Sequence, residues 1–218
     1  MLAKKRGHIA LISVHADPAM IEANGIASVQ SAYIKKLGEG LAQAGWQVDI
    51  FTRRTDAEQP SEVEHCEGCR TIRLDAGPQT IIEADDLADY LPDFLKAFLQ
   101  HQSRTGILYP IVHTNYWLSG WVGLELKKKQ LLKLVHTHHV LGSDRYQHST
   151  TVPMVASAQI SAEKACKELA DHIVAIHPEQ DGMQSSDQGA ATVEELDELY
   201  LTLLGQLHRE FFTVQPAG

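Results

Sequence analysis

Residues 109–139, YPIVHTNYWLSGWVGLELKKKQLLKLVHTHH, contain a complete strand–helix–strand unit. The short apolar runs at 109–115 and 131–139 are typical of strands that are buried on both faces of a sheet. The segment between them, 117–129, predicts a helix that ends in a run of lysines. Two consecutive strands joined by a helix run parallel, because the helix carries the chain back across the sheet. This stretch therefore predicts a β-α-β unit and an α/β fold.

The same alternation of strand and helix extends along most of the chain. Apolar runs predict further strands at 8–14, 46–52, 70–76 and 172–177, and apolar stripes at three-to-four spacing predict helices at 28–45, 84–102, 160–170 and 193–212. Gly45 is expected to end the first helix, and Pro92 to bend or restart the second. The pattern predicts a doubly wound, Rossmann-like parallel sheet with helices on both faces, followed by an added C-terminal helix. We expect a lobe at 1–178, a Gly-, Ser- and Gln-rich linker at 179–192, and a helix in 193–218 that packs back on the lobe.

Composition excludes several classes of function. The chain has 218 residues and a net charge of −9, which argues against a nucleic-acid-binding protein. It has no apolar run of the roughly 20 residues that a membrane helix needs, so we expect a soluble, cytoplasmic protein. Its three cysteines fit a reducing compartment. The CxxC within residues 65–69, HCEGC, has no second ligand pair for zinc and is interpreted as a loop with incidental thiols.

Histidines and arginines gather where the predicted strands end. In parallel α/β sheets, ligands bind beyond the carboxyl ends of the strands, and this edge holds four segments: 15–18, 53–54, 113–116 and 136–142. His113, His136 and His138 alternate with apolar residues, so each is either a site residue or a hydrogen-bonded core histidine. A three-histidine metal site is disfavoured, because His136 and His138 share one face of a strand while His139 points to the other. No G-x-G-x-x-G, P-loop or G-x-S-x-G motif is present.

Five motifs occur in an order that resembles the retaining glycosyltransferases of GT-B fold, and in particular bacterial sucrose-phosphate synthases and their inositol-phosphate-glycosylating relatives. The motifs are SVHADP, GEGLAQAGWQVDIFTRR, TIRLDAGP, YPIVHTNYWLSGWVG and VHTHHVLG. The resemblance covers about residues 7–178. It implies one lobe of a two-lobed enzyme: the N-terminal lobe binds the acceptor, the C-terminal lobe binds a nucleotide-sugar donor, and the reaction takes place between them. It also implies that no metal or other cofactor is required.

The resemblance implies roles for particular residues. His139 matches the family histidine that contacts the transferred sugar and stabilises developing charge, and is the expected catalytic residue. Gln30 and Tyr116 are expected to bind substrate. The family has a Gly-Gly pair at the start of its first helix, where the backbone approaches a phosphate. Ser28 and Val29 occupy those positions here, and Val29 narrows the approach.

Three further positions are expected to face the acceptor phosphate. The resemblance places basic residues there, but Thr80 and Gln159 are neutral in this chain and Arg145 alone keeps the charge. A charge-assisted hydrogen bond contributes roughly 1.5–3 kcal/mol. Losing two of them predicts an acceptor affinity lower by about two to three orders of magnitude.

The sequence has no second alternation of strands and helices that would form a donor lobe, so it resembles a transferase whose middle has been deleted. We expect an acceptor-lobe protein that is catalytically impaired and serves as a phosphosugar-binding or interaction module. The alternative is an active hexosyltransferase that a separate donor-lobe chain completes. In either case the uncovered apolar surface near Trp117, Leu118 and Trp121 is expected to favour self-association.

Overall fold

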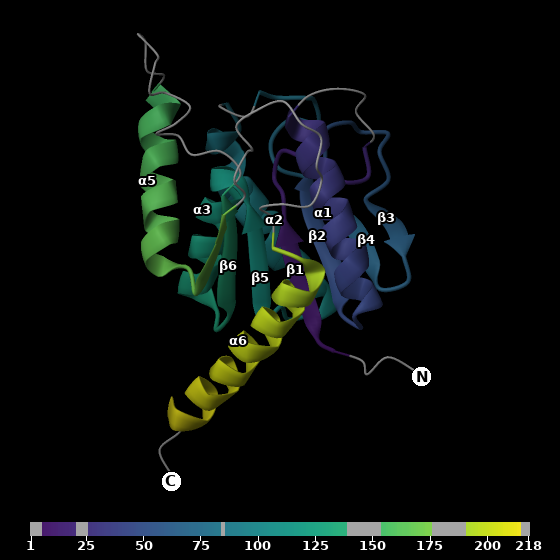
Figure 1. Cartoon of the computed structure of the whole chain (residues 1–218). Helices are drawn as coiled ribbons and strands as arrows, with labels where there is room; N and C mark the ends of the chain where they lie inside the picture. The colour runs from purple at the N-terminus through teal and green to yellow at the C-terminus, as the bar shows by residue number, and fades with distance from the viewer. Residues whose placement is uncertain (1–5, 21–25, 84–85, 139–153, 176–190, 215–218) are drawn as a thin grey trace, which may run out of the picture.

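A seven-stranded sheet forms the centre of the protein, with helices on both of its faces (Figure 1). The computed structural model describes residues 6–20, 26–83, 86–138, 154–175 and 191–214. Its strands are β1 (His8–Ile12), β2 (Gln47–Arg53), β3 (Glu62–Cys66), β4 (Cys69–Leu74), β5 (Ile111–Asn115), β6 (Lys133–His138) and β7 (His172–Ala175). Its helices are α1 (Ile26–Gln43), the 3-10 helix η1 (Asp86–Tyr90), α2 (Leu91–Thr105), α3 (Tyr116–Lys129), α5 (Met154–Leu169) and α6 (Val193–Val214).

The strand order is β3-β4-β2-β1-β5-β6-β7, and every pair except β3–β4 is parallel. The chain starts near the middle of the sheet and winds outward in both directions, which confirms the predicted doubly wound fold. The interpretation of residues 65–69 as a loop was wrong. These residues close an antiparallel hairpin, in which Gly68 takes a φ of +84° that an L side chain rarely adopts.

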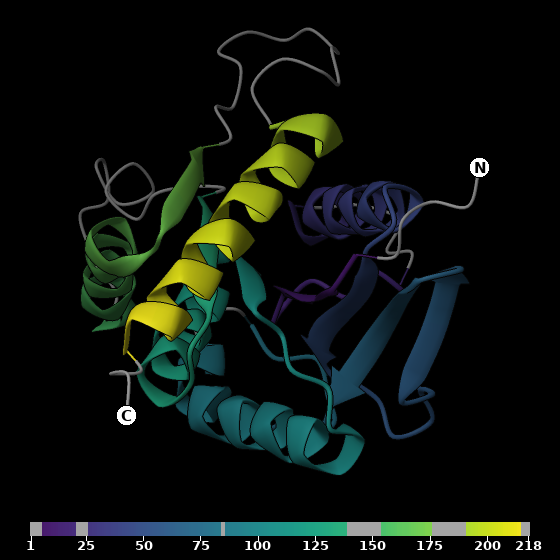
Figure 2. The same ribbon diagram turned by 90° about the horizontal axis from the view of Figure 1, so that it is seen from below.

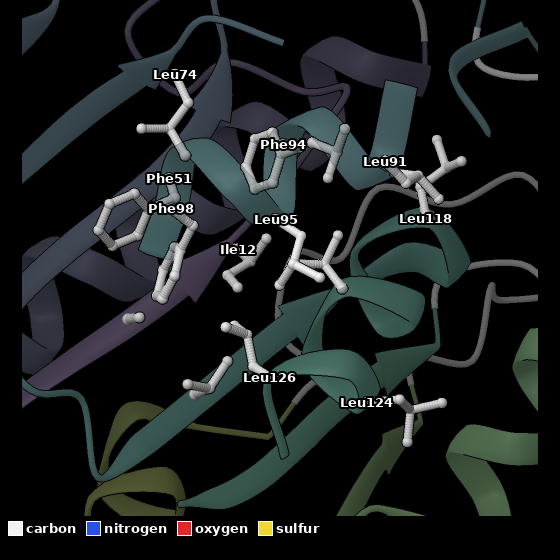
Figure 3. Close-up of a cluster of buried hydrophobic side chains, with 14 of the residues drawn as sticks. Ile12, Phe51, Leu74, Leu91, Phe94, Leu95, Phe98, Leu118, Leu124 and Leu126 are labelled. Carbon is white, nitrogen blue, oxygen red and sulfur yellow. The ribbon is translucent and has the colours of Figure 1, made fainter. Parts of the chain in front are cut away.

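Two apolar cores lie on opposite faces of the sheet. On one face, α1 and α6 cover the sheet, and the yellow α6 runs across it in Figure 2. On the other face, α2, α3 and α5 contribute side chains, with Phe51, Phe94 and Phe98 grouped together in Figure 3. Strands buried by helices on both sides need apolar residues at successive positions, which explains the continuous apolar runs of the sequence.

Both predicted helix signals hold, whereas one predicted helix boundary does not. α1 ends at Gln43, and Gly45 follows with a φ of +101°. Pro92 lies in the first turn of α2, directly after η1, so the helix restarts there. The predicted helix at 160–170 begins earlier than expected, because α5 starts at Met154.

The C-terminal helix α6 packs through one apolar stripe on the face that α1 also covers. Leu196, Tyr200 and Leu203 are buried against β1, β5 and α1 side chains. At its first turns, Asp197 accepts a 2.7 Å hydrogen bond from Nε1 of Trp46 and forms an ion pair with Arg6. Within the described ranges, no helix is both long enough and apolar enough to cross a membrane.

The expected apolar surface around α3 is not uncovered. Trp117 is 3% exposed, Leu118 is fully buried and Trp121 is partly buried, because α3 packs on the sheet beside α2 and α5. The basis for predicted self-association at this surface was therefore wrong. The large apolar side chains that do reach solvent near the carboxyl edge are Val29 and Ile81, which are 70% and 74% exposed.

Candidate functional site

The loops that follow β1, β2, β5 and β6 leave the sheet from one edge. Ile12 is aligned with both Phe51 and Thr114, and Asn115 with Thr137, so these parallel strands end at nearly the same level. The segments 15–18, 53–54 and 113–116, and the described part of 136–142 up to His138, therefore do converge there. This is the edge at which α/β sheets bind ligands.

His15, Gln30 and Tyr116 form the core of the candidate site. They come from the loop after β1, the start of α1 and the end of β5, and Gln30 and Tyr116 are buried. The His15 ring lies 4.7 Å from the Tyr116 ring and close to the Gln30 side chain. Two of the predicted substrate-binding residues, Gln30 and Tyr116, are thus brought to one place, together with a histidine of the predicted edge.

Tyr116 has an unusual backbone conformation at the point where β5 turns into α3. Its φ is +70°, and it is the one positive-φ residue other than glycine in the described part of the chain. A bulky residue in this region carries backbone strain of about 1–3 kcal/mol, and such strain is concentrated at functional sites. The conformation places the Tyr116 ring against His15.

Buried polar atoms in this cluster remain available for a ligand. Nδ1 of His15 and Oε1 of Gln30 are shielded from solvent, and neither has a hydrogen-bond partner among the described residues. An unsatisfied buried polar group costs roughly 1–3 kcal/mol, so a hydroxyl-bearing ligand that paired with these atoms would recover that cost. The two atoms offer a neutral surface suited to sugar hydroxyls.

Burial lowers the pKa of the His15 imidazole to about 4, and the neighbouring Gln30 side chain only partly opposes this shift. His15 is therefore neutral at pH 7. Its folded pKa lies below its unfolded value of about 6.5, so the unfolded chain binds more protons under pH 6.5 and stability falls as the pH drops. Because His15 keeps partial solvent exposure, we expect it to account for a loss of about 1–2 kcal/mol between pH 7 and pH 5.

This expectation is checked by urea unfolding of wild type and His15→Asn at pH 7 and pH 5. The variant should lose less stability than wild type over this range, and the difference isolates His15 from the other histidines. Parallel pH dependences of the two proteins would contradict the assignment.

Three arginines lie at the same edge, and each is engaged with protein groups. Arg53 is buried and donates to the carbonyl oxygens of Pro78 and Thr80 at 2.6 and 2.5 Å. Arg73 donates to Asp17 at 2.7 Å, and Arg54 lies 3.5 Å from Asp75. These guanidinium groups hold loops of the site in position.

Of the predicted phosphate-facing residues, the structure describes Thr80 and Gln159. The Thr80 side chain is exposed on the loop whose backbone Arg53 binds. Gln159 is fully buried in α5 and donates to Oε1 of Glu163, one turn along the helix, at 2.8 Å. Ser28 belongs to α1, but its side chain lies outside the described residues, as do His139 and Arg145 entirely.

Two of the strand histidines, His113 and His136, are hydrogen-bonded in the core. His113 bonds Tyr200 through Nδ1 at 2.5 Å and Thr137 through Nε2 at 2.6 Å, and His136 bonds Thr114 at 2.8 Å. The His136 and His138 rings lie 4.6 Å apart, which confirms that they share a face. In the described ranges, no three His, Cys, Asp or Glu side chains are placed to hold a metal ion.

Sequence reasoning missed the part that Arg53 plays. Its partners are backbone carbonyls more than twenty residues away, and no sequence pattern reveals them. The available signal was a basic residue directly at the end of an apolar strand, where a buried cation needs several acceptors.

A family model for the glycosyl transferase 4-like domain matches residues 30–181. Among curated proteins, the D-inositol 3-phosphate glycosyltransferase of Thermobifida fusca is 34% identical over 174 residues, which are 78% of this chain and 39% of that protein. The chain thus spans about two fifths of the length of this curated relative.

The sucrose-phosphate synthase of Thermosynechococcus elongatus matches in structure with a TM-score of 0.71 and 44% identity, over 78% of this chain and 42% of that chain. A second solved chain of that enzyme is named with the residue ranges 27–220 and 406–426. It matches 94% of this chain over 99% of its own length, at 36% identity and a TM-score of 0.63. These matches, together with the sheet order, show that the chain belongs to the glycosyl transferase 4-like family and has the fold of the N-terminal lobe of a GT-B glycosyltransferase.

Proposed function

We propose that this protein is an acceptor-lobe protein of the sucrose-phosphate synthase type, which binds a sugar phosphate weakly and does not transfer a glycosyl group by itself. In this proposal His15, Gln30 and Tyr116 contact the hydroxyl groups of the sugar. Arg145 provides the charge for the phosphate, and His139 keeps the position of the family's catalytic histidine. Residues 1–178 then form the lobe that carries the acceptor site, and α6 packs against one face of the sheet of that lobe.

The observation that carries the proposal is the lack of free positive charge among the described groups of the carboxyl edge. Arg53 and Arg73 are hydrogen-bonded to protein acceptors, Arg54 lies in a loose ion pair with Asp75, and His15 is neutral at pH 7. A phosphate dianion needs charge-assisted hydrogen bonds for tight binding. The cluster can therefore recognise sugar hydroxyls but holds a phosphate weakly, which supports a binding role with reduced affinity.

The extent of the similarity supports the second part of the proposal. The chain matches less than half of the sucrose-phosphate synthase chain, but almost the whole of the shorter chain named with two residue ranges. A GT-B transferase binds its donor in the other lobe, so a lobe alone holds one substrate and lacks the groups that hold the second.

Calorimetric titration with fructose 6-phosphate, fructose, UDP-glucose and ADP-glucose tests the proposal. We expect fructose 6-phosphate to bind in the millimolar range and both nucleotide sugars to show no binding. Arg145→Ala should weaken fructose 6-phosphate binding by about 10-fold or more, because it removes a charge-assisted bond. Lys96→Ala, which removes an exposed charge from α2, is the matched control and should bind as wild type does.

Two results would overturn the proposal. Sucrose phosphate formation by this chain alone from UDP-glucose and fructose 6-phosphate would contradict the loss of catalysis. An absence of fructose 6-phosphate binding at millimolar concentration, in a protein that unfolds cooperatively, would contradict the acceptor site.

The intact cluster of His15, Gln30 and Tyr116 favours one second candidate, an active hexosyltransferase completed by a separate donor-lobe chain. An acceptor site that served no reaction would have no need of buried, unsatisfied polar atoms. Under this alternative, adding the isolated donor lobe of a sucrose-phosphate synthase should restore turnover, and His139→Ala should abolish it.

A further inference from the structure

Cys66 and Cys69 face each other across the tightest turn of the β3–β4 hairpin. They are direct partners in the antiparallel register, separated by the turn residues Glu67 and Gly68. Opposed residues of an antiparallel pair have Cα atoms about 4.5–5.5 Å apart, which falls within the range of about 4.4–6.8 Å that a disulfide spans. The backbone therefore already has the spacing that a bond between these two side chains requires.

The two sulfur atoms are also directed toward each other. A side-chain hydrogen bond joins the Cys66 and Cys69 thiols. Cys69 is 2% exposed, and its Sγ is held beneath α1, where a Cβ on Gly38 would lie only 3.0 Å away. Cys66 is partly exposed. One thiol is thus fixed in the interior while its neighbour is accessible from solvent.

The third cysteine does not compete for this pairing. Cys166 is fully buried in α5, in the core on the opposite face of the sheet. A Cβ on Gly120 would approach its Sγ within 2.7 Å, so α3 packs closely over it. Any disulfide within the chain must therefore join Cys66 and Cys69.

We propose that Cys66 and Cys69 form a reversible disulfide that fastens the β3–β4 hairpin at the edge of the sheet. With glutathione disulfide as oxidant, the accessible Cys66 sulfur attacks the S–S bond and releases one glutathione thiol. Cys69 then attacks Cys66 in the mixed disulfide and releases the second glutathione. One S–S bond breaks and one forms, two electrons pass to glutathione, and the two cysteine protons end on the two glutathione thiols.

The surroundings of the two cysteines favour a disulfide that forms slowly and resists reduction. Burial and the carboxylates of Glu39 and Glu64 raise the pKa of the Cys66 thiol, and burial raises the pKa of Cys69 to about 12. Reduction of the disulfide must release one of these disfavoured thiolates as leaving group, so the bond resists reduction once formed. The pair differs in this from catalytic CxxC sites, whose thiol pKa values are lowered.

The bond would act on the edge strand and leave the candidate site unchanged. β3 pairs only with β4 among the described strands, and the hairpin turn lies at the end of β4 opposite the carboxyl edge. A disulfide that closes a four-residue loop removes some conformational freedom from the unfolded chain. We expect oxidation to raise the melting midpoint by about 4 °C, without a change in fructose 6-phosphate binding.

Mass spectrometry of the full chain after incubation with glutathione disulfide tests this inference. Both cysteines lie in one tryptic peptide, residues 55–70, because no lysine or arginine separates them. We expect this peptide to lose the mass of two hydrogen atoms and to resist alkylation, and thiol reductants to reverse both effects. Cys166→Ser should behave as wild type does, whereas Cys66→Ser should remain alkylable at Cys69.

A stable glutathione adduct on Cys66, or a melting midpoint that does not rise on oxidation, would overturn the inference. The inference does not rest on the proposed function, since thiol state and melting are measured without any sugar. Loss of sugar binding in the oxidised but not the reduced protein would likewise contradict the separation of the hairpin from the site.

Discussion

Replacing Tyr200 by alanine is expected to lower the free energy of unfolding by about 3–5 kcal/mol, because a fully buried aromatic ring is removed. The ring lies at the centre of the α6 contact: it packs edge-on against Trp46 at 5.8 Å, and its hydroxyl bonds His113 at 2.5 Å. Tyr200→Phe keeps the ring and loses the hydroxyl, so a smaller loss of about 1–2 kcal/mol is expected. Urea unfolding followed by circular dichroism measures both.

The neighbouring residue provides the control. Leu201 is 46% exposed on the outer side of α6, and Leu201→Ala should change stability by less than about 0.5 kcal/mol. If Tyr200→Ala unfolds at the same urea concentration as Leu201→Ala, then α6 is not docked as described.

The docking of α6 has a consequence for the carboxyl edge. Tyr200 bonds His113, and His113 bonds Thr137, so a buried polar chain joins α6, β5 and β6. Thr137 lies two residues before His139. A helix that is distant in sequence therefore fixes the strand that leads to the expected catalytic histidine, which gives the lobe a physical reason to retain α6.

The sequence predicted the parts of the fold that depend on periodicity. Apolar runs marked the six parallel strands, and Gly45 and Pro92 marked helix limits correctly. It missed β3, because EVEHC is short, contains two glutamates and is only partly buried, and its pattern differs from that of a strand buried on both faces. The prediction of an uncovered apolar surface failed at Trp117 and Leu118, because both are buried where α3 packs against the sheet and its neighbouring helices.

The sequence could predict the position of a candidate site residue only where the end of a strand fixes that position. Gln30 and Tyr116 both lie beside His15 because the parallel register brings their segments to one edge. Gln159 was expected beside the phosphate on the basis of resemblance, yet its described contact is with Glu163 inside α5. Hydrogen bonds within a helix turn and to backbone carbonyls, such as those of Arg53, depend on side-chain packing that a sequence pattern does not specify.

Restoring a positive charge at Thr80 is expected to strengthen fructose 6-phosphate binding by about 10- to 100-fold, equivalent to one charge-assisted hydrogen bond. Thr80 is exposed, and Arg53 holds its carbonyl oxygen at 2.5 Å, so Thr80→Lys changes the side chain while the loop stays anchored. Gln159→Arg is expected to add less. Its position is fully buried, and Glu163 beside it will compete with the phosphate for the guanidinium group.

Two controls separate a restored site from a general gain in charge. Gln79→Lys introduces the same charge one residue away on the same exposed loop and should strengthen binding less than threefold, since long-range attraction is screened by salt. Fructose, which has no phosphate, should bind Thr80→Lys and wild type equally. If Gln79→Lys gives the same gain as Thr80→Lys, or if fructose also binds more tightly, the loop does not face an acceptor phosphate. A gain confined to Thr80→Lys and to the phosphorylated sugar would instead identify a missing cation as the cause of weak binding, and would do so without relying on catalysis.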